Sequence, residues 1–329
     1  MIAGLEPVVL HVPGSVLRDA PKLASFYGKI GDGLCARGAV VDYIEHQRDH
    51  TLEQIDRMAG FHIVDHGRIR HPRVLNAGLG FVRPYYYLDP WGIRAFSSLS
   101  EKQFRADLID PVAATAFRDG LVASLVSGRR SRYEQPAQIL PVPPHCIAVF
   151  LQTEAHRDVA ETCHMTMRHM MKSLLARDDP RAIVVKLHPR DTDLATLEWL
   201  MQKARKDPRL QIIPANIHDI LAVCDVVVTI NSAVGVEAMV HRKPVVLCGH
   251  ADFHHCATTV RSRAEMDKAI QTALATSWPY DAFLFWYFKI NALSATSPEL
   301  VDDVVTRIAE TCFDISRLGL IPPSLPAHQ

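Results

Sequence analysis

The sequence predicts an α/β protein in which two Rossmann-type domains are joined by a proline-rich segment. Short apolar, β-branched runs alternate with stretches of helical length along most of the chain, as in parallel, doubly wound sheets. The 329 residues are enough for two domains of ordinary size. Residues 127–146, SGRRSRYEQPAQILPVPPHC, carry four prolines between two periodic regions, which is typical of an interdomain linker.

The N-terminal half contains apolar runs that predict strands, and two stretches that predict helices. The strands are expected over residues 8–12, 40–45, 61–65 and 85–88, and the helices over 51–59 and 101–127. The boundary of this first domain is expected near residue 143, where the proline-rich segment ends.

Beyond that boundary strands and helices alternate more regularly, which predicts a parallel sheet. Strands are expected over 147–151, 183–187, 210–213, 226–229 and 244–247, and helices over 159–177, 193–206, 217–223, 234–240, 281–293 and 298–318. The predicted domains are residues 1–143, residues 144–285, and a C-terminal helical segment, 286–329, that packs back on the first domain. Two Rossmann-type domains that face each other across a cleft, with helices returning to the first, form the GT-B architecture.

Composition excludes several classes of function. Lysine plus arginine equals aspartate plus glutamate at 36 each, and a net charge of zero argues against a nucleic-acid partner. The seven cysteines form no CxxC pair and no secretory leader is recognisable, so we expect reduced thiols and a cytoplasmic protein. No apolar run reaches the length of a membrane span, so any contact with the inner membrane is expected to be peripheral.

The clearest candidate site follows two predicted strands of the second domain, in IVVKLHPRD and VVVTINSAVGVEAM. Proline after His188 ends the strand and aims the imidazole out of the sheet edge at which α/β sheets bind ligands. Asn231 and Ser232 form a turn before a helix, which suits a phosphate, although Ser232 would also serve as a helix cap. Lys186 either adds charge or is solvated, and Glu237 either binds ribose hydroxyls or favours the helix N-terminus. These residues predict a site for a nucleotide-linked donor.

Carboxylates near these elements are candidates for the chemistry of sugar transfer. Transfer with retention uses a carboxylate at the anomeric carbon, and transfer with inversion uses a carboxylate or histidine as general base. Glu154 and Asp158, in FLQTEAHRD, are expected to face the cleft, and Asp158 is equally suited to cap the next helix. Asp65 ends a strand of the first domain and is expected to meet the acceptor, whereas Asp89, before Pro-Trp-Gly, is interpreted as a turn former.

No metal site is predicted. His250, His254, His255 and Cys256 are ligand types, but their spacing fits no standard structural zinc pattern. The sequence also contains no GxGxxG, Walker A or GxSxG motif, which argues against dinucleotide, P-loop and serine-hydrolase functions.

Four segments together resemble the retaining β-Kdo transferases of bacterial capsule and O-antigen assembly. They are KLHP, TINSAVGVEAM, KPVVLCGHADF and DHGRIRHPRVLNAGLGFVRPYYYLDPWGIRAFSSL, and the likeness covers about residues 60 to 290. The resemblance implies a GT-B fold, a CMP-linked Kdo donor, a glycan or glycolipid acceptor, and neither a metal nor another cofactor at the transfer step. It also implies that His188, Asn231 and Ser232 hold the donor phosphate.

The resemblance further implies a catalytic carboxylate about four positions after Gln152, and here the sequence departs from the family. That position is His156, so either flanking residue, Glu154 or Asp158, is expected to substitute, with Glu154 the first choice. The family's Glu-Asp-Gly element is here Asp65-His66-Gly67.

Three other functions are compatible with these motifs. A CDP-glycerol or CDP-ribitol phosphotransferase shares the His-Pro motif and a serine-containing turn, and a CMP-dependent sialyltransferase also has a His-Pro motif. A non-catalytic GT-B-like factor for capsule assembly or export would explain the missing acid at His156.

Overall fold

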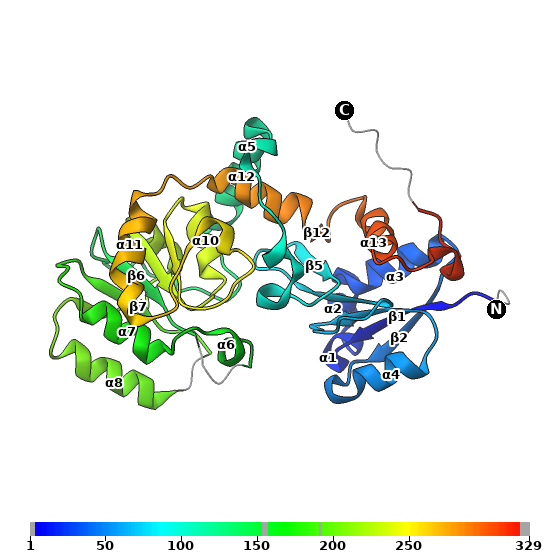
Figure 1. The fold of residues 1–329 in the computed structure, drawn as a ribbon, viewed down its shortest axis with the longest axis horizontal. Coiled ribbons are helices and arrows are strands. Elements are labelled where there is room, and N and C mark those ends of the chain that lie inside the picture. The colour runs from blue at the N-terminus through cyan, green and yellow to red at the C-terminus, as the bar shows by residue number, and fades with distance from the viewer. Residues whose placement is uncertain (1–3, 153–156, 191–192, 323–329) are drawn as a thin grey trace. The chain divides into compact units, whose positions relative to one another are not determined.

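The computed structural model describes residues 4–152, 157–190 and 193–322. The chain forms two compact units, each built on a six-stranded sheet. The first unit contains Met1–Glu101 and Phe288–Gln329, and the second contains Lys102–Tyr287 (Figure 1). The prediction of two α/β halves is confirmed.

The second unit has an all-parallel sheet with the strand order β11-β10-β9-β6-β7-β8. Its strands are β6 (Ile147–Phe150), β7 (Ile183–Lys186), β8 (Leu210–Ile212), β9 (Val226–Thr229), β10 (Val245–Leu247) and β11 (Thr258–Thr259). In chain order this is 3-2-1-4-5-6, the doubly wound Rossmann arrangement. The strand order reverses between β6 and β9, so the carboxyl ends of these two strands form the ligand-binding position of the fold.

Helices connect these strands. They are α6 (Arg157–Thr162), α7 (Met167–Leu175), α8 (Leu194–Ala204), α9 (Ile217–Val223), α10 (Val234–Val240) and α11 (Met266–Ala275). Asp193 and Asn216 cap α8 and α9 with their side chains. The single helix predicted over 159–177 is wrong, because Cys163 bridges to Gly249 and Thr166 caps a new helix, α7.

The first unit has a mixed sheet with the order β12-β5-β4-β3-β1-β2. Its strands are β1 (Pro7–Val12), β2 (Val40–Glu45), β3 (Phe61–Asp65), β4 (Val74–Leu79), β5 (Tyr85–Asp89) and β12 (Leu293–Ser294). β1 to β4 run parallel, and β5 and β12 are antiparallel to their neighbours. The strand order reverses between β1 and β3, so this unit also has a position suited to a ligand at the carboxyl ends of two central strands.

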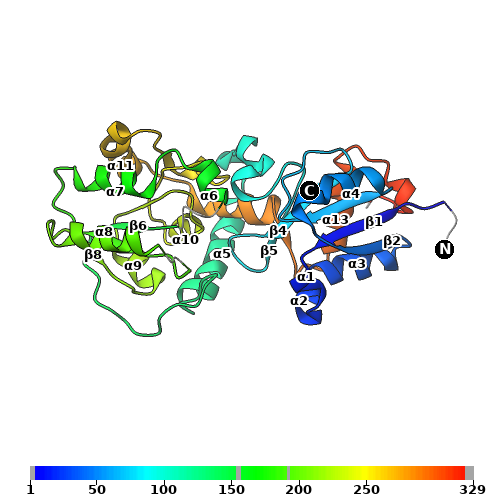
Figure 2. The same ribbon diagram turned by 90° about the horizontal axis from the view of Figure 1, so that it is seen from below.

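Helices cover both faces of this sheet (Figures 1 and 2). They are α1 (Gly14–Leu17), α2 (Ala20–Ser25), α3 (Tyr27–Ala36), α4 (Thr51–Arg57) and α13 (Leu300–Ala309). Ile30 of α3 and Val304 of α13 belong to one core cluster with Val8 and Leu10 of β1, whereas Ile55 of α4 packs in another. The C-terminal segment therefore completes the first unit, as predicted.

The units divide between Glu101 and Lys102, and not near residue 143 as expected. The reason is that α5 (Pro111–Leu121) packs against α12 (Tyr280–Phe285), within the second unit. The helix predicted from residue 101 begins only at Pro111, because Asp110 caps it by accepting a hydrogen bond from the Val112 N–H.

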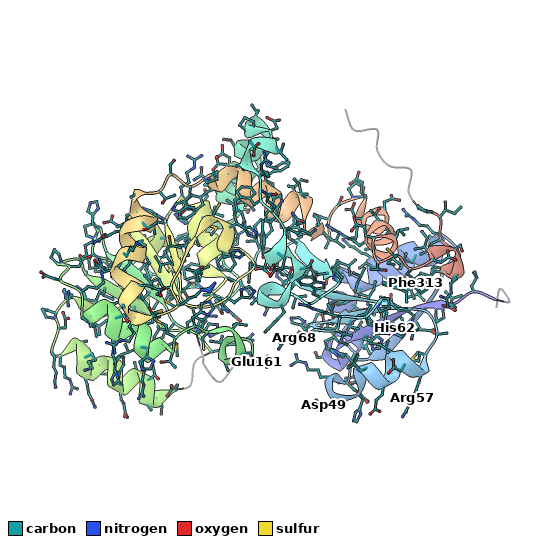
Figure 3. All side chains as sticks on the ribbon, in the orientation of Figure 1. Asp49, Arg57, His62, Arg68, Glu161 and Phe313 are labelled. Carbon is teal, nitrogen blue, oxygen red and sulfur yellow. The ribbon has the colours of Figure 1, made fainter. Side chains whose placement is uncertain are left out.

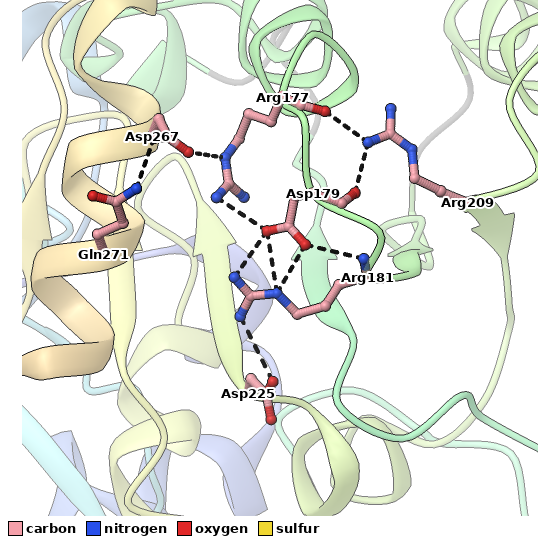
Figure 4. A network of polar contacts seen from close by, with 7 residues as sticks. All are labelled: Arg177, Asp179, Arg181, Arg209, Asp225, Asp267 and Gln271. Carbon is pink, nitrogen blue, oxygen red and sulfur yellow. Dashed lines mark hydrogen bonds and ion pairs between the residues drawn. The ribbon is translucent and has the colours of Figure 1, made fainter.

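A network of arginines and carboxylates closes the amino ends of the second unit's strands (Figure 4). Asp179 is its centre, with ion pairs to Arg177 at 3.0 Å and Arg181 at 2.8 Å, while Arg209 donates to the carbonyls of residues 177 and 179. Hydrogen bonds from Arg181 hold the pKa of Asp179 at about 2. These polar groups pair with one another at the edge of the sheet opposite the ligand-binding position.

Among the residues that the structure describes, none of the helices is both long enough and apolar enough to cross a membrane.

Candidate functional site

Gln152 and Asn231 join the two strand ends at the ligand-binding position of the second unit. Gln152 follows β6 and Asn231 follows β9. The Gln152 Nε2 donates to Asn231 Oδ1 at 3.0 Å, and the Asn231 backbone N–H donates to Gln152 Oε1 at 3.0 Å. Asn231 Nδ2 also donates to Thr162 Oγ1 at 2.7 Å and to the His250 carbonyl at 3.0 Å. Asn231 thus fixes the turn, and its amide is fully occupied by protein groups.

Ser232 follows Asn231 and lies in the turn just before α10. Its Oγ accepts from the Val234 N–H at 3.3 Å within the turn, but Ala233, and not Ser232, occupies the N-cap position of α10. Gly235 packs closely behind it: a Cβ there would lie 2.7 Å from the Phe253 ring. The turn is therefore held in place by the packing of Gly235 against Phe253 and by the hydrogen bonds of Asn231.

His188 lies at the end of the neighbouring strand, β7, two residues beyond Lys186. Its Nδ1 accepts from the Arg190 N–H at 3.2 Å, which places the proton of the neutral ring on Nε2 and makes Nε2 a donor. The Tyr133 ring meets the imidazole edge to face at 5.0 Å, and the Arg190 guanidinium lies over Tyr133 at 4.9 Å. The ring of His188 is thus held in a defined orientation by two neighbours.

The Lys186 ammonium group is bonded within the protein and is not a free cation. Its Nζ donates to the Ala215 carbonyl at 2.6 Å, and burial lowers its pKa. The contact ties β7 to the loop before α9, which is a structural function. A contact from Lys186 to a donor phosphate stays a prediction.

Glu237 is buried in α10, with a relative exposure of 2%. Its Oε1 accepts from Ser131 Oγ at 2.9 Å, and its Oε2 lies 3.6 Å from His218 Nε2. Burial raises the pKa of Glu237 to about 8, so the carboxyl is largely protonated at neutral pH. A protonated carboxyl adds little charge to the helix N-terminus, so of the two expected roles the electrostatic one is disfavoured.

Residues 129–137, interpreted from the sequence as linker, are instead bound to the second unit. Arg129 pairs with Asp219 at 2.6 Å, and the Ile217 N–H donates to Gln135 Oε1 at 3.2 Å. Through Ser131 and Tyr133 the segment contacts Glu237 and His188, two of the predicted donor residues. No local pattern indicated these contacts, because they join residues far apart in the sequence.

Two predicted carboxylates are incompletely described. Glu154 lies outside the described residues. Asp158 is the second residue of α6 (Arg157–Thr162), so its backbone lies inside the first turn and not at the N-cap position. Their catalytic roles stay predictions.

In the first unit, Asp65 ends β3 at the position where the strand order reverses. Tyr27 donates to Asp65 Oδ1, and His66 Nδ1 lies 2.7 Å from Asp65 Oδ2. Sequence reasoning gave no role to His66 or Tyr27. The only local signal was the Asp-His-Gly sequence after a buried strand.

Asp89 is a turn former, as predicted. Its Oδ1 accepts from the backbone of Trp91 at 2.8 Å, and its Oδ2 accepts from the hydroxyls of Ser97 and Ser98 at 2.9 and 2.7 Å. Its carboxylate therefore holds together the loop that follows β5.

The histidines after β10 are held by protein groups. His255 Nε2 bonds to the Lys102 carbonyl at 2.9 Å, and His254 Nδ1 bonds to the Ala251 carbonyl at 2.9 Å. In the described part of the chain, no three His, Cys, Asp or Glu residues come together in a way that could hold a metal ion.

Replacing Asn231 by alanine should destabilise the second unit by about 1–3 kcal/mol, because three partly buried hydrogen bonds, to Gln152, Thr162 and the His250 carbonyl, are lost. Hydrogen exchange of the β9 amides measures the effect. The exposed Gln103→Ala variant is the control, and unchanged protection of β9 in Asn231→Ala would contradict the prediction.

Comparison with known proteins gives a family model and a fold. The model described as "Capsule polysaccharide biosynthesis protein" matches residues 128–289. The structure "Thermosulfurimonas dismutans KpsC, beta Kdo 2,7 transferase" is 16% identical, with a TM-score of 0.57, and the match covers 94% of this chain and 100% of that one. The structure of the "beta Kdo 2,4 transferase" of the same protein is also 16% identical, with a TM-score of 0.52 and coverage of 84% and 89%. No curated protein sequence matches this chain. The chain therefore has a GT-B-like fold.

Proposed function

We propose that this protein is a glycosyltransferase of bacterial surface polysaccharide assembly, which transfers Kdo or a related 2-keto sugar acid from a CMP-linked donor to a glycan or glycolipid. The observation that carries the proposal is the junction of Gln152 and Asn231 at the switch point of the second sheet, with His188 at the next strand end. These residues lie within the segment that the capsule polysaccharide family model matches. The elements around them make up most of that segment.

In this proposal the second unit binds the donor. His188 Nε2 and the Ser232 turn supply hydrogen bonds to the phosphate, and Asn231 holds the turn in place. Protein groups of this kind can stabilise the leaving phosphate without a divalent ion, so we propose transfer without metal or cofactor. The first unit would serve the acceptor.

The principal alternative is a CDP-glycerol or CDP-ribitol phosphotransferase, which would use the same cytidine site and transfer a different group. A non-catalytic assembly factor would bind glycan without releasing CMP. Release of CMP from CMP-Kdo, compared with release from CDP-glycerol, separates these functions.

The His188→Ala variant should bind CMP more weakly by about 1–3 kcal/mol, because a hydrogen bond to a charged phosphate is lost. Isothermal titration calorimetry with CMP measures the change. The matched control is His145→Ala, which removes an exposed imidazole before β6, at the opposite edge of the same sheet. Equal CMP affinity in wild type and a folded His188→Ala variant would contradict the assignment of the donor site.

A further inference from the structure

We infer that His66 is the residue of the first unit that accepts the proton of the acceptor hydroxyl, with Asp65 as the residue that positions its ring. This inference rests on the proposed function. It replaces the expectation that Asp65 itself meets the acceptor.

The Asp65 carboxylate is occupied on both oxygens. Its relative exposure is 7%; Tyr27 donates to Oδ1, and His66 Nδ1 bonds to Oδ2 at 2.7 Å. A carboxylate enclosed in this way cannot also receive a proton from a bound sugar without losing a partner. It can hold an imidazole, because a carboxylate at Nδ1 keeps the Nδ1 proton in place and stabilises the cation that forms.

The backbone holds His66 in one position. Its φ is +50°, an uncommon conformation for a residue other than glycine, and its N–H donates to the Ala77 carbonyl at 2.7 Å. The turn that follows is tied to the buried Asn76, which accepts from the Ile69 N–H and donates to the Ile69 carbonyl, both at 3.0 Å. Gly67 allows this approach, since a Cβ there would lie 2.2 Å from Asn76 Oδ1.

The remaining ring nitrogen, Nε2, is the reactive one. The His66 side chain is 32% exposed, and its hydrogen bonds within the described part of the chain are made by Nδ1. With the proton on Nδ1, Nε2 carries a lone pair at the switch point of β1 and β3. Asp65, and His46 at the end of β2, are the titratable groups beside it, and Tyr27 acts through Asp65.

The proposed step is a balanced proton transfer. The acceptor oxygen forms a bond to the anomeric carbon while the bond from that carbon to its leaving group breaks. The hydroxyl proton moves to His66 Nε2, and the imidazolium is stabilised by the Asp65 carboxylate. No oxidant, metal or further reactant is required.

The test compares His66→Ala, His66→Gln and Asp65→Asn in the full-length protein, with CMP-Kdo as donor and a synthetic Kdo-terminated glycolipid as acceptor. Removing a general base should lower kcat by about 100-fold or more while CMP affinity is unchanged. Imidazole added to His66→Ala should restore part of the turnover. The Asp65→Asn variant should also lose kcat, because the amide favours the wrong tautomer of His66.

A spectroscopic measurement tests the positioning role separately from activity. In ¹⁵N NMR spectra of the histidine rings near neutral pH, His66 should carry its proton on Nδ1 in the wild type and on Nε2 in Asp65→Asn. The exposed His50→Gln variant is the control and should transfer at the wild-type rate. Near-normal kcat in folded His66→Ala and His66→Gln, or the Nε2–H tautomer in the wild type, would overturn the inference. A wild type that binds no CMP and transfers no sugar would overturn the proposed function instead.

Discussion

Acidification from pH 7 to pH 5 should destabilise the first unit by about 2 kcal/mol for each of two buried histidines, His11 and His62. These residues lie side by side on β1 and β3, both fully buried, and His62 can be located in Figure 3. His11 Nε2 and His62 Nδ1 are 2.8 Å apart, a distance that one shared hydrogen satisfies. Protonation of both rings would place two cations in contact inside the unit.

The sign of the effect follows from the pKa values. Burial, with a smaller contribution from the neighbouring His62, lowers the pKa of His11 from 6.5 to about 3. Burial, with a smaller contribution from the Arg73 charge, lowers the pKa of His62 to about 4. Below pH 6.5 the unfolded chain binds two protons that the folded unit does not bind. Stability is therefore complete above about pH 6.5 and is lost as the pH falls towards 4.

Hydrogen exchange of the β1 and β3 amides between pH 7.5 and 5, corrected for intrinsic exchange rates, measures this loss. The double variant His11→Leu/His62→Leu should show a much flatter pH dependence, because replacing both partners by apolar groups removes the titration without leaving a buried donor. The exposed pair His50→Gln/His145→Gln is the matched control and should keep the wild-type dependence. A double leucine variant as acid-sensitive as the wild type would show that other groups are responsible.

Under the proposed function, replacing the candidate catalytic carboxylate by its amide should reduce transfer by about 1000-fold or more and leave CMP binding intact, because the lost interaction belongs to the transition state. Glu154→Gln is expected to have this effect. Asp158 lies in the first turn of α6, where a carboxylate also favours the helix N-terminus, so its structural and catalytic explanations both stand. Both residues are therefore candidates in the same experiment.

The test uses the Glu154→Gln and Asp158→Asn variants separately. Transfer, CMP affinity and Tm are measured for each variant. Loss of transfer in Asp158→Asn alone, with normal Tm, would reverse the two roles. If both variants stay active, the carboxylate lies elsewhere. The exposed Glu198→Gln on α8 is the control for removing a surface carboxylate.

The sequence predicted those elements whose pattern is local. β1, β2 and β3 are short runs made mostly of apolar or β-branched residues, and α9 and α10 were predicted with their observed bounds. β4 was missed because VLNAGLG contains an asparagine and two glycines that suggest a loop. In the structure Gly78 packs closely against Ile93, since a Cβ there would lie 2.7 Å from the end of the Ile93 side chain. Contacts of this kind are made across the sheet and leave no mark in the neighbouring sequence.

In the candidate site, too, local features could be predicted from the sequence and long-range contacts could not. The positions of His188, Asn231 and Ser232 at strand ends could be predicted, because strand endings and helix starts are local signals. Their partners could not. The bond between Gln152 and Asn231 joins residues 79 positions apart, and Tyr133 reaches His188 from a segment whose prolines suggested a linker. That both oxygens of Asp65 are occupied also depends on Tyr27, a residue on another element.

The division of the first unit between the two ends of the chain has a consequence for biosynthesis. Lys102–Tyr287 is continuous, so the second unit can fold as soon as it leaves the ribosome, whereas the first needs Phe288–Gln329. Until then the sheet lacks β12 at its edge, and the apolar residues that α13 buries through Leu300, Val304 and Ile308 stay exposed to water. The N-terminal strands are synthesised first but are completed last. During that interval they are the part of the nascent chain most in need of a chaperone.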